Sequence, residues 1–464
     1  MKKLGGISVP HFKNTAYHKP EVMPVPAEVM LPMSMHSGTP AKPVVSVGDA
    51  VKVGQVIGEA AGFVSSPVHS TVSGKVKSID YIDGLRGEKA VTITITSDGA
   101  QTPWDDITPP KVSSLEEFLE AVKNSGVVGL GGAGYPTAPK LTLKDYSKLD
   151  YILINGAECE PFITSDTRTM VDDAEYVWEG IQLLKEYLKP KKIVICIEKN
   201  KPEPIKIMQE LVRKSLSSGT EGPPSEKGIE VCVLPSLYPQ GERKVLVYNV
   251  TGRIVPEGGR LPDIGCIVVN CTTVATFAKF IKTGMPLVSK CVTVDGSAVK
   301  NPKNVIAPIG TPVRDIFNYC GGLRDDVKKI ILGGPMMGAA IPNQDIPIVK
   351  ITNSLLALSE KDAAGLSAQP PEPTACIRCG RCIFKCPMRL MPPNIENAFE
   401  LKKPELLRQL KVAMCAECAC CAYSCPAKRP LVQVMTLAKN MLWEYEKAEK
   451  AKASPNAGEK KEAK

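Results

Sequence analysis

Two cysteine runs with the same spacing organise this chain: CIRCGRCIFKCP at residues 376–387 and CAECACCAYSCP at residues 415–426. Each follows the pattern Cys-x2-Cys-x2-Cys-x3-Cys-Pro, in which three thiolates hold one iron–sulfur cluster and the fourth thiolate reaches a second cluster. The repeat therefore predicts two [4Fe–4S] clusters with exchanged fourth ligands. The first cluster would be bound by Cys376, Cys379, Cys382 and Cys425, and the second by Cys415, Cys418, Cys421 and Cys386.

Zinc is the main alternative for these thiols, because tetrahedral zinc sites also use short cysteine spacings. A third cysteine two residues on and a terminal Cys-Pro are seldom needed for zinc, and they favour the clusters. Cys420 stands beside Cys421 and breaks the repeat. We expect it to be a spare thiol rather than a substitute ligand.

Length and composition limit the class of protein. A chain of 464 residues, 43% of them hydrophobic, predicts a globular protein with three or more domains. Half of the sixteen cysteines lie outside the cluster pattern without a disulfide framework, which indicates a reducing cytosol. The chain shows neither an apolar leader nor an 18-residue apolar run, so we expect no membrane span of its own. The net charge of +9 comes without a basic patch interleaved with aromatic residues, so we expect no nucleic-acid binding.

The first hundred residues predict two segments. Residues 1–35 are rich in proline and should form an extended arm. Residues 36–100 hold short β-branched runs punctuated by glycine, which predicts a barrel-sandwich domain that resembles lipoyl- and biotinyl-carrier domains. Ala60-Ala61-Gly62-Phe63 stands where a carrier would present its modified lysine, so the fold would be kept without the swinging arm.

Residues 111–286 read as an α/β domain. Ser114 and Glu117 form a capping box that should open a helix ending near Asn124. Apolar residues between 174 and 188 keep helical spacing. Strands alternating with helices predict a largely parallel sheet. The expected strands are 151–154, 192–197, 229–234 and 266–269.

The last third of the chain predicts three further parts. Residues 287–350 show a strand, an Asp-Gly turn, a second strand, a helix and a third strand, which suits a β-grasp domain. Residues 370–445 would form a helical, ferredoxin-like domain around the two clusters. Residues 446–464 are rich in Ala, Lys and Glu and are expected to be a disordered charged tail.

A glycine-rich loop and three sets of polar residues give the α/β domain its candidate site. Glycines at 129, 131, 132 and 134 let a backbone approach a phosphate or a flavin ring closely, although an ordinary packing turn explains the loop alone equally well. The spacing is neither the dinucleotide fingerprint nor a P-loop. A parallel sheet binds ligands at the end where its strands finish. For the acidic residues after the first of these strands, a solvated acidic turn is the alternative. The polar residues that follow expected strands are Asn155, Glu158 and Glu160, then Tyr238, Gly241 and Glu242, then Asn270 and Thr273.

These motifs together resemble the C subunit of the Rnf electron-transport complex and, more distantly, the flavoprotein subunit of complex I. The quoted stretches are GLGGAGYPT at 129–137, NGAECEP at 155–161, GGPMMG at 333–338 and the paired cysteine runs. The resemblance implies a Rossmann-like FMN- and NADH-binding domain and a soluble-ligand-binding (SLBB) β-grasp domain. The residues implied to bind FMN are Gly129, Gly131, Gly132, Ala133, Gly134, Lys140, Asn155, Glu158, Tyr238, Gly241, Glu242, Asn270 and Thr273. Those implied to bind NADH are Tyr135, Lys140 and Glu160.

One stretch departs from the family pattern. Rnf subunits usually read Tyr-Pro-Gln-Gly-x-Glu-Lys, whereas here Glu242 comes one place early and Arg243 occupies the acidic position. The departure concerns the expected nicotinamide contacts and leaves the expected flavin site as it stands.

The resemblance implies a ferredoxin:NAD oxidoreductase subunit that exchanges hydride between NAD(H) and FMN and passes single electrons through two clusters. It would dock peripherally on the cytoplasmic side of the cell membrane, against a ferredoxin-type cluster subunit and membrane subunits. No acid, base or nucleophile is needed, so no catalytic residue is expected. One alternative is a soluble paralogue, such as a cobalamin reductase or the electron carrier of proline reductase. Another is a two-cluster carrier whose α/β domain only binds or docks, which bound FMN would exclude.

Overall fold

The computed structural model describes residues 4–83, 89–217, 228–360 and 372–453, which form two compact units. The large unit comprises Pro10–Ser236 and Leu246–Gln369, and the cluster unit comprises Met1–Val9, Leu237–Val245 and Pro370–Lys464. Among the helices of the described residues, none is both long and apolar enough to cross a membrane.

The barrel-sandwich part of the large unit has two small antiparallel sheets. One sheet has the strand order β2 (Glu28–Pro32), β8 (Lys89–Ser97), β7 (Gly74–Asp83) and β4 (Ala50–Val51). The other consists of β3 (Lys42–Pro43), β5 (Val56–Glu59) and β6 (Val68–His69). The buried side chains between them include Val29, Leu31, Ile57, Val68, Ile93 and Ile95.

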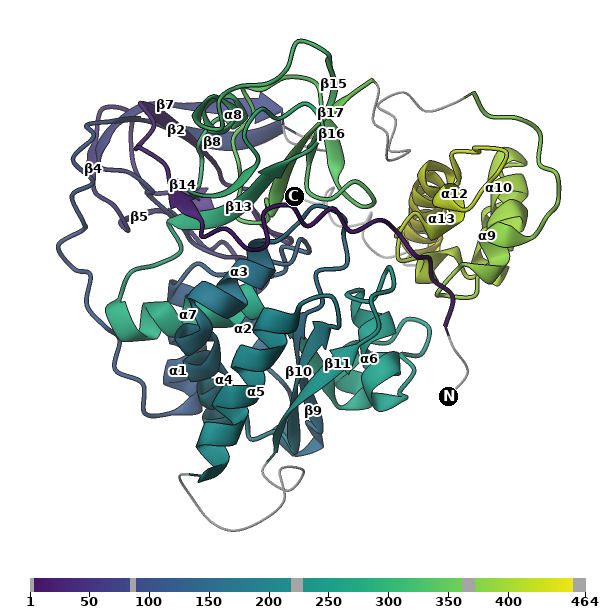
Figure 1. Ribbon diagram of the computed structural model, residues 1–464, viewed down its shortest axis with the longest axis horizontal. Helices are drawn as coiled ribbons and strands as arrows, with labels where there is room; N and C mark the ends of the chain where they lie inside the picture. The colour runs from purple at the N-terminus through teal and green to yellow at the C-terminus, as the bar shows by residue number, and fades with distance from the viewer. Residues whose placement is uncertain (1–3, 84–88, 218–227, 361–371, 454–464) are drawn as a thin grey trace, which may run out of the picture. The chain divides into compact units, whose positions relative to one another are not determined.

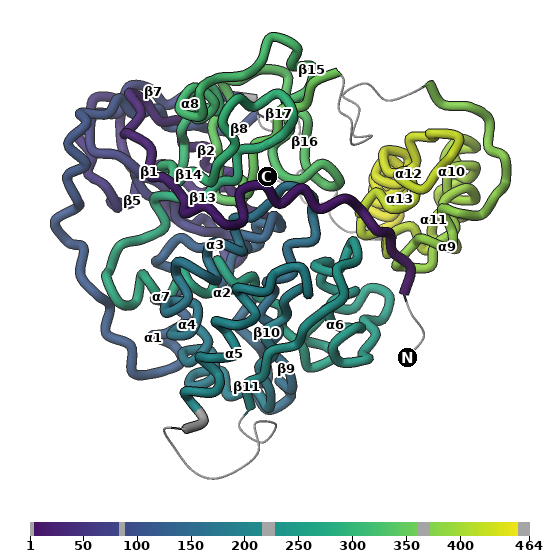
Figure 2. The backbone as a smooth tube through the Cα atoms, viewed as in Figure 1, coloured from purple at the N-terminus to yellow at the C-terminus, as the bar shows by residue number. Residues whose placement is uncertain are grey.

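The N-terminal arm is shorter than the sequence predicted. No helix lies within residues 4–35, but β2 pairs with β8 over its whole length and belongs to the barrel. Alternate residues of β2 are buried, and this burial stabilises the strand as part of the sheet. From Pro10, where the arm enters the large unit, the chain runs to β1 (Glu21–Val22), which pairs with β14 of another sheet (Figure 2).

The α/β part is built on a parallel four-stranded sheet. The strand order is β11 (Ile229–Leu234), β10 (Lys192–Glu198), β9 (Tyr151–Gly156) and β12 (Cys266–Asn270), and the four strands are those expected from the sequence. One face packs against α1 (Leu115–Asn124), α4 (Ala174–Leu188), α5 (Pro202–Ser217) and α7 (Cys271–Thr283), and the other packs against α6 (Arg243–Thr251) (Figure 1). The capping box of Ser114 and Glu117 is present at α1, as predicted.

The β-grasp sheet extends beyond the predicted end at residue 350. Its strand order is β1, β14 (Lys303–Pro308), β13 (Ser289–Asp295), β17 (Ser354–Ser359), β15 (Val327–Leu332) and β16 (Ala339–Ile341), with α8 (Val313–Tyr319) packed against it. All six residues of β17 are buried, because this strand lies between β13 and β15. Strand β17 is thus the last strand of this sheet in sequence but lies in the middle of the sheet, which its position in the sequence does not indicate.

Lys350 joins the barrel to the α/β part within the large unit. Its side chain is buried, and its ammonium donates to the carbonyls of Pro67 at 2.6 Å and Gly126 at 2.7 Å and to the Ser66 hydroxyl at 3.3 Å. Burial lowers the pKa of Lys350 to about 7. Three acceptors match the three hydrogens of the ammonium, so Lys350 fixes the position of these loops.

The cluster unit is helical. Its helices are α9 (Arg381–Phe384), α10 (Pro392–Glu400), α11 (Pro404–Gln409), α12 (Cys420–Tyr423) and α13 (Leu431–Ala453), packed through a core of eight buried residues that includes Met435, Ala438 and Leu442. The prediction of a disordered tail from residue 446 is wrong as far as Ala453, where α13 ends. Arg408 forms ion pairs with Glu446 and Glu449, which hold these turns against the unit. Residues 454–464 lie outside the described residues.

Candidate cofactor and cluster sites

The glycine-rich loop is a tight turn closed by its own backbone. Gly129 donates its N–H to Tyr135 O at 2.9 Å and accepts from Gly134 N at 3.0 Å. Gly132 and Gly134 have φ of +106° and +64°, which strongly favour glycine. A Cβ on Gly131 would stand 3.2 Å from the Asn270 amide, so glycine also permits close approach at that position.

The N-terminus of α7 braces this loop. The Thr273 hydroxyl accepts from Leu130 N at 2.9 Å and donates to Val128 O at 3.1 Å, and the Asn270 side chain caps α7 by accepting from Thr273 N. Lys140 on α2 (Thr137–Leu141) also reaches back, so that a Cβ on Gly129 would lie 3.3 Å from its ammonium. The structure thus brings the loop, Lys140, Asn270 and Thr273 together, and the positive end of α7 lies beside them. Such an end suits an anion such as a phosphate.

The loop that follows β9 uses its acidic side chains inside the protein. The Glu158 carboxylate accepts from Asp166 N at 2.7 Å and from the Thr167 hydroxyl at 2.6 Å, at the start of α3 (Ser165–Asp172). Burial raises the pKa of Glu158. Glu160 accepts from Met336 N at 3.0 Å, and a Cβ on Gly334 would collide with its carboxylate. The stretch at 333–338 is therefore shaped around Glu160.

Asn155 and Asp166 complete the ligand end of the sheet. Asn155 is the last residue but one of β9, and its side-chain oxygen accepts from Ala157 N at 3.2 Å. The Asp166 carboxylate accepts from the Asn270 amide and from the Thr272 hydroxyl, both at 2.7 Å. Asp166 thereby links the loop after β9 to the N-terminus of α7, a role that the sequence analysis did not predict.

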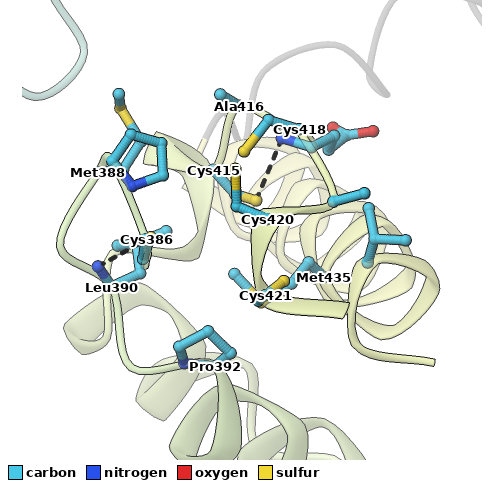
Figure 3. A pocket seen from close by; sticks show the side chains of 14 residues that line it. Cys386, Met388, Leu390, Pro392, Cys415, Ala416, Cys418, Cys420, Cys421 and Met435 are labelled. Atoms are coloured by element: carbon cyan, nitrogen blue, oxygen red, sulfur yellow. Dashed lines mark hydrogen bonds between the residues drawn. The ribbon is translucent and has the colours of Figure 1, made fainter. Parts of the chain in front are cut away.

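The second cluster site is a cavity lined by five cysteines, four of which are the predicted ligands of the second cluster. Cys415, Cys418 and Cys421 come from the second run, and Cys386 comes from the first, as the exchanged pattern predicts (Figure 3). The N–H of Glu417 lies 3.3 Å from the Cys415 sulfur, and the N–H of Leu390 lies 3.3 Å from the Cys386 sulfur. Such N–H···S bonds stabilise a thiolate-bound cluster and tune its potential. The donor set therefore fits an iron–sulfur cluster.

The first cluster site lies nearer the surface. Cys382 packs with Cys425 of the second run, whereas Cys376 and Cys379 are exposed. In the described part of the chain, no three His, Cys, Asp or Glu side chains are close enough together to hold a single metal ion. A cubane requires a wider arrangement, because its four irons stand between the thiolates. The assignment of the eight ligands stays a prediction.

Comparison with known proteins agrees with this arrangement. The chain matches three family models: the RnfC barrel sandwich hybrid domain at residues 1–100, the Nuo51 FMN-binding domain at 122–279 and the SLBB domain at 291–340. It is 38% identical to the C subunit of the proton-translocating ferredoxin:NAD(+) oxidoreductase complex of Clostridium ljungdahlii, over 84% of this chain and 82% of the relative. It is also 38% identical to the C subunit of the Na(+)-translocating ferredoxin:NAD(+) oxidoreductase complex of Acetobacterium woodii, over 84% and 86% respectively.

This chain belongs to the family of Rnf complex C subunits. Among solved structures, an NAD+-reducing [NiFe]-hydrogenase in the H2-reduced state is similar with a TM-score of 0.48 and 15% identity, covering 76% of this chain and 66% of that one.

Within this member of the Rnf family, one stretch of predicted cofactor contacts lies in the cluster unit. Tyr238, Gly241 and Glu242 fall in Leu237–Val245, apart from the unit that contains the glycine-rich loop. The Glu242 carboxylate accepts from Lys244 N at 2.8 Å and Val245 N at 2.9 Å, so it caps α6. This cap gives the early glutamate a structural role. The flavin contacts of these three residues stay a prediction.

Cys420 also contacts this stretch. Its side chain is fully buried at the rim of the second cluster cavity, and its thiol lies 3.9 Å from Tyr238 O, the weak bond of a protonated sulfur. A thiol engaged in this way suits the spare cysteine expected from the sequence.

Two lysines that sequence reasoning missed hold the candidate flavin loops. The Lys13 ammonium donates to the carbonyls of Glu158 at 2.9 Å, Glu160 at 2.8 Å and Ile163 at 2.5 Å. Burial lowers its pKa to about 8. Beside it, the ring of Phe12 stacks on Phe162 with centroids 5.0 Å apart. Because Lys13 lies in the arm, 145 residues before Glu158, no local pattern indicated this contact.

Lys290 plays the corresponding part at the glycine-rich loop. From β13 its ammonium donates to Leu130 O at 3.1 Å and to the Asn353 amide oxygen at 2.6 Å, and burial lowers its pKa to about 8. Ser37 binds the same loop through Ala133 O at 3.1 Å and Gly134 O at 2.9 Å. A lysine at an inward position of an apolar strand was the one signal that could have revealed it.

Proposed function

We propose that this chain is the NADH- and FMN-binding electron-transfer subunit of a membrane-associated ferredoxin:NAD oxidoreductase. It would exchange hydride between NAD(H) and FMN and pass single electrons through two [4Fe–4S] clusters. The observation that carries the proposal is that one chain holds both a braced glycine-rich loop at the ligand end of a parallel sheet and a cavity lined by Cys386 with the thiols of the second run.

The residues of the loop fit a flavin mononucleotide. When bound, FMN supplies the step between a two-electron hydride donor and one-electron clusters. Gly131 leaves room beside Asn270, and the N-terminus of α7 with Lys140 offers positive charge for the phosphate. Glu158 and Asp166 fix the loops around that position, and Tyr135 and Glu160 would face the dinucleotide. The protein itself would position FMN and the dinucleotide and would exclude water from them, so no catalytic acid or base is proposed.

The partners follow from the family. The relatives are named as subunits of ion-translocating ferredoxin:NAD(+) oxidoreductase complexes. We propose that this chain docks peripherally on the cytoplasmic side of the cell membrane, against a ferredoxin-type cluster subunit and membrane subunits. Co-sedimentation with membranes, with release by salt or detergent, is the expected behaviour. A soluble paralogue would stay in the supernatant.

Anaerobic reconstitution tests the cofactors. The protein should hold about one FMN and about eight irons per chain, and NADH should bleach the flavin absorption band. A Cys376→Ala variant should keep that bleaching in stopped flow but lose electron delivery to the partner. Eight irons without flavin would contradict the proposal and leave a two-cluster carrier.

A further inference from the structure

The two cluster sites differ in how far they lie from solvent. Of the predicted ligands of the first site, Cys382 and Cys425 are buried but Cys376 and Cys379 are exposed. None of the predicted ligands of the second site is exposed: Cys418 is buried, and Cys386, Cys415 and Cys421 are half-buried. Electron tunnelling weakens steeply with distance. A protein partner can therefore exchange electrons faster with the first cluster than with the second.

The first cysteine run and the residues just after it carry several exposed basic side chains. Residues 376–391 contain four basic side chains and no acidic one, and all four are exposed: Arg378, Arg381, Lys385 and Arg389. Within the described part of the chain none of them forms an ion pair. The matching stretch of the second run, 415–430, has one acidic residue, Glu417, and only two basic ones, Lys428 and Arg429. A thiolate-bound cluster is anionic and offsets part of this charge, but the side chains project their field outward.

Two large apolar side chains of the same stretch are also exposed. Phe384 is 79% exposed and Ile377 is 65% exposed. The Phe384 ring lies 3.2 Å from the place of a Cβ on Gly380, which is the residue after Cys379. Exposed apolar anchors within a charged rim are typical of protein interfaces. These two residues and the four basic ones define the cationic cluster face.

We infer that the cationic cluster face docks an acidic iron–sulfur protein, which exchanges single electrons with the first cluster. This inference rests on the proposed function and names where its electron partner binds. One electron leaves the reduced cluster of the partner and enters the first cluster, or moves in the reverse direction, and no bond or proton changes. Opposite charges would steer the encounter, and Phe384 and Ile377 would exclude water at its centre.

Stopped flow with a reduced, acidic two-[4Fe–4S] ferredoxin as the probe tests the inference on the full-length reconstituted protein. The double variant Arg381→Glu/Lys385→Glu is compared with Lys402→Glu/Lys403→Glu, which makes the same charge change at exposed residues between α10 and α11. At low salt the first variant should react at least about tenfold more slowly and lose most of its dependence on ionic strength. The second should stay within about twofold of the unmodified protein.

Iron analysis and EPR restrict the comparison to proteins with equal cluster content. If reversal of charge prevents cluster loading, the neutral pair Arg381→Ala/Lys385→Ala should show an intermediate slowing. Equal slowing of the two reversed variants, or an unchanged salt dependence, would overturn the inference. Binding to phosphatidylglycerol vesicles is measured in parallel. Vesicle binding lost only in the first variant, with ferredoxin transfer unchanged, would assign the face to a membrane surface instead.

The outcomes separate the inference from the proposed function. If NADH fails to bleach a flavin in the unmodified protein, the proposed function is wrong. If NADH bleaches it and the reversed cluster face still reacts normally with ferredoxin, only the docking inference is wrong.

Discussion

The candidate flavin loops and the cysteine runs are held in place by different means. Lys13 and Lys290 bind loop carbonyls from distant parts of the large unit, so the protein itself fixes these loops. The cysteine runs lie on short helices and loops, and the described buried apolar residues of their unit form two small clusters, of eight and four members. We conclude that the flavin loops are organised by the polypeptide and the cysteine runs by the clusters that they would bind.

Loss of a cluster should give the largest effect. Cys421→Ser should remove the second cluster, leave about four irons per chain and destabilise the cluster unit, because cluster binding contributes folding free energy. Calorimetry should then show two separate transitions, with NADH bleaching of the flavin retained. Cys420→Ser is the matched control in the same cavity and should keep its iron. Iron lost from the control would make Cys420 a ligand.

Removal of the Lys13 ammonium should be the next largest effect. Lys13→Met keeps the aliphatic stem but removes the Lys13 donor from the carbonyls of Glu160 and Ile163, whereas Glu158 O keeps Lys201 at 3.4 Å. The loss should cost about 2 kcal/mol of unfolding free energy. The KM for NADH should rise, because Glu158 and Glu160 lose their support. Denaturant unfolding and steady-state kinetics measure both. Lys19→Met, at an exposed position of the same arm, should change neither. Equal effects of the two variants would refute the bracing role.

Lys350 should give the large unit a characteristic pH dependence. Its pKa is about 7 in the fold, against an ordinary value of 10.5. Between these values the unfolded chain holds a proton that the fold has released, so raising the pH stabilises the fold. This group alone adds up to about 1.4 kcal/mol per pH unit. Urea unfolding at pH 7.5, 8.5 and 9.5 should show a shallower rise for Lys350→Met. Parallel curves would contradict this expectation.

Substitution of Lys290 should give the smallest of these effects, and the effect should be confined to FMN binding. Lys290→Met removes one donor from the glycine-rich loop, and FMN should bind about tenfold more weakly, or about 1.4 kcal/mol. Fluorescence titration of the apoprotein measures this change. Lys300→Met, exposed shortly after the same strand, should bind FMN normally. Weaker FMN binding by the Lys300→Met variant would show that the loop responds to net charge rather than to the Leu130 contact.

Local patterns predicted the elements that depend on neighbouring residues. The four strands of the parallel sheet have continuous apolar runs, and the cysteine spacing led to the site that contains Cys386. Features that depend on distant partners were missed. Lys13 looks like an ordinary surface lysine in sequence, and the only sign of Lys290 is its inward position in an apolar strand. Strand β17 is placed by strands that precede it by tens of residues. The last turns of α13 depend on Arg408, which a composition rich in Ala, Lys and Glu does not reveal.

The arm that carries Lys13 also determines the order in which the large unit can fold. During synthesis this segment appears 145 residues before Glu158 and 289 residues before Asn304, whose side chain donates to Thr15 O at 3.0 Å. Contacts of such high sequence separation form slowly. The arm must therefore wait unpaired while the sheets that receive it are made. We expect the large unit to become resistant to proteases late, after β14 has left the ribosome.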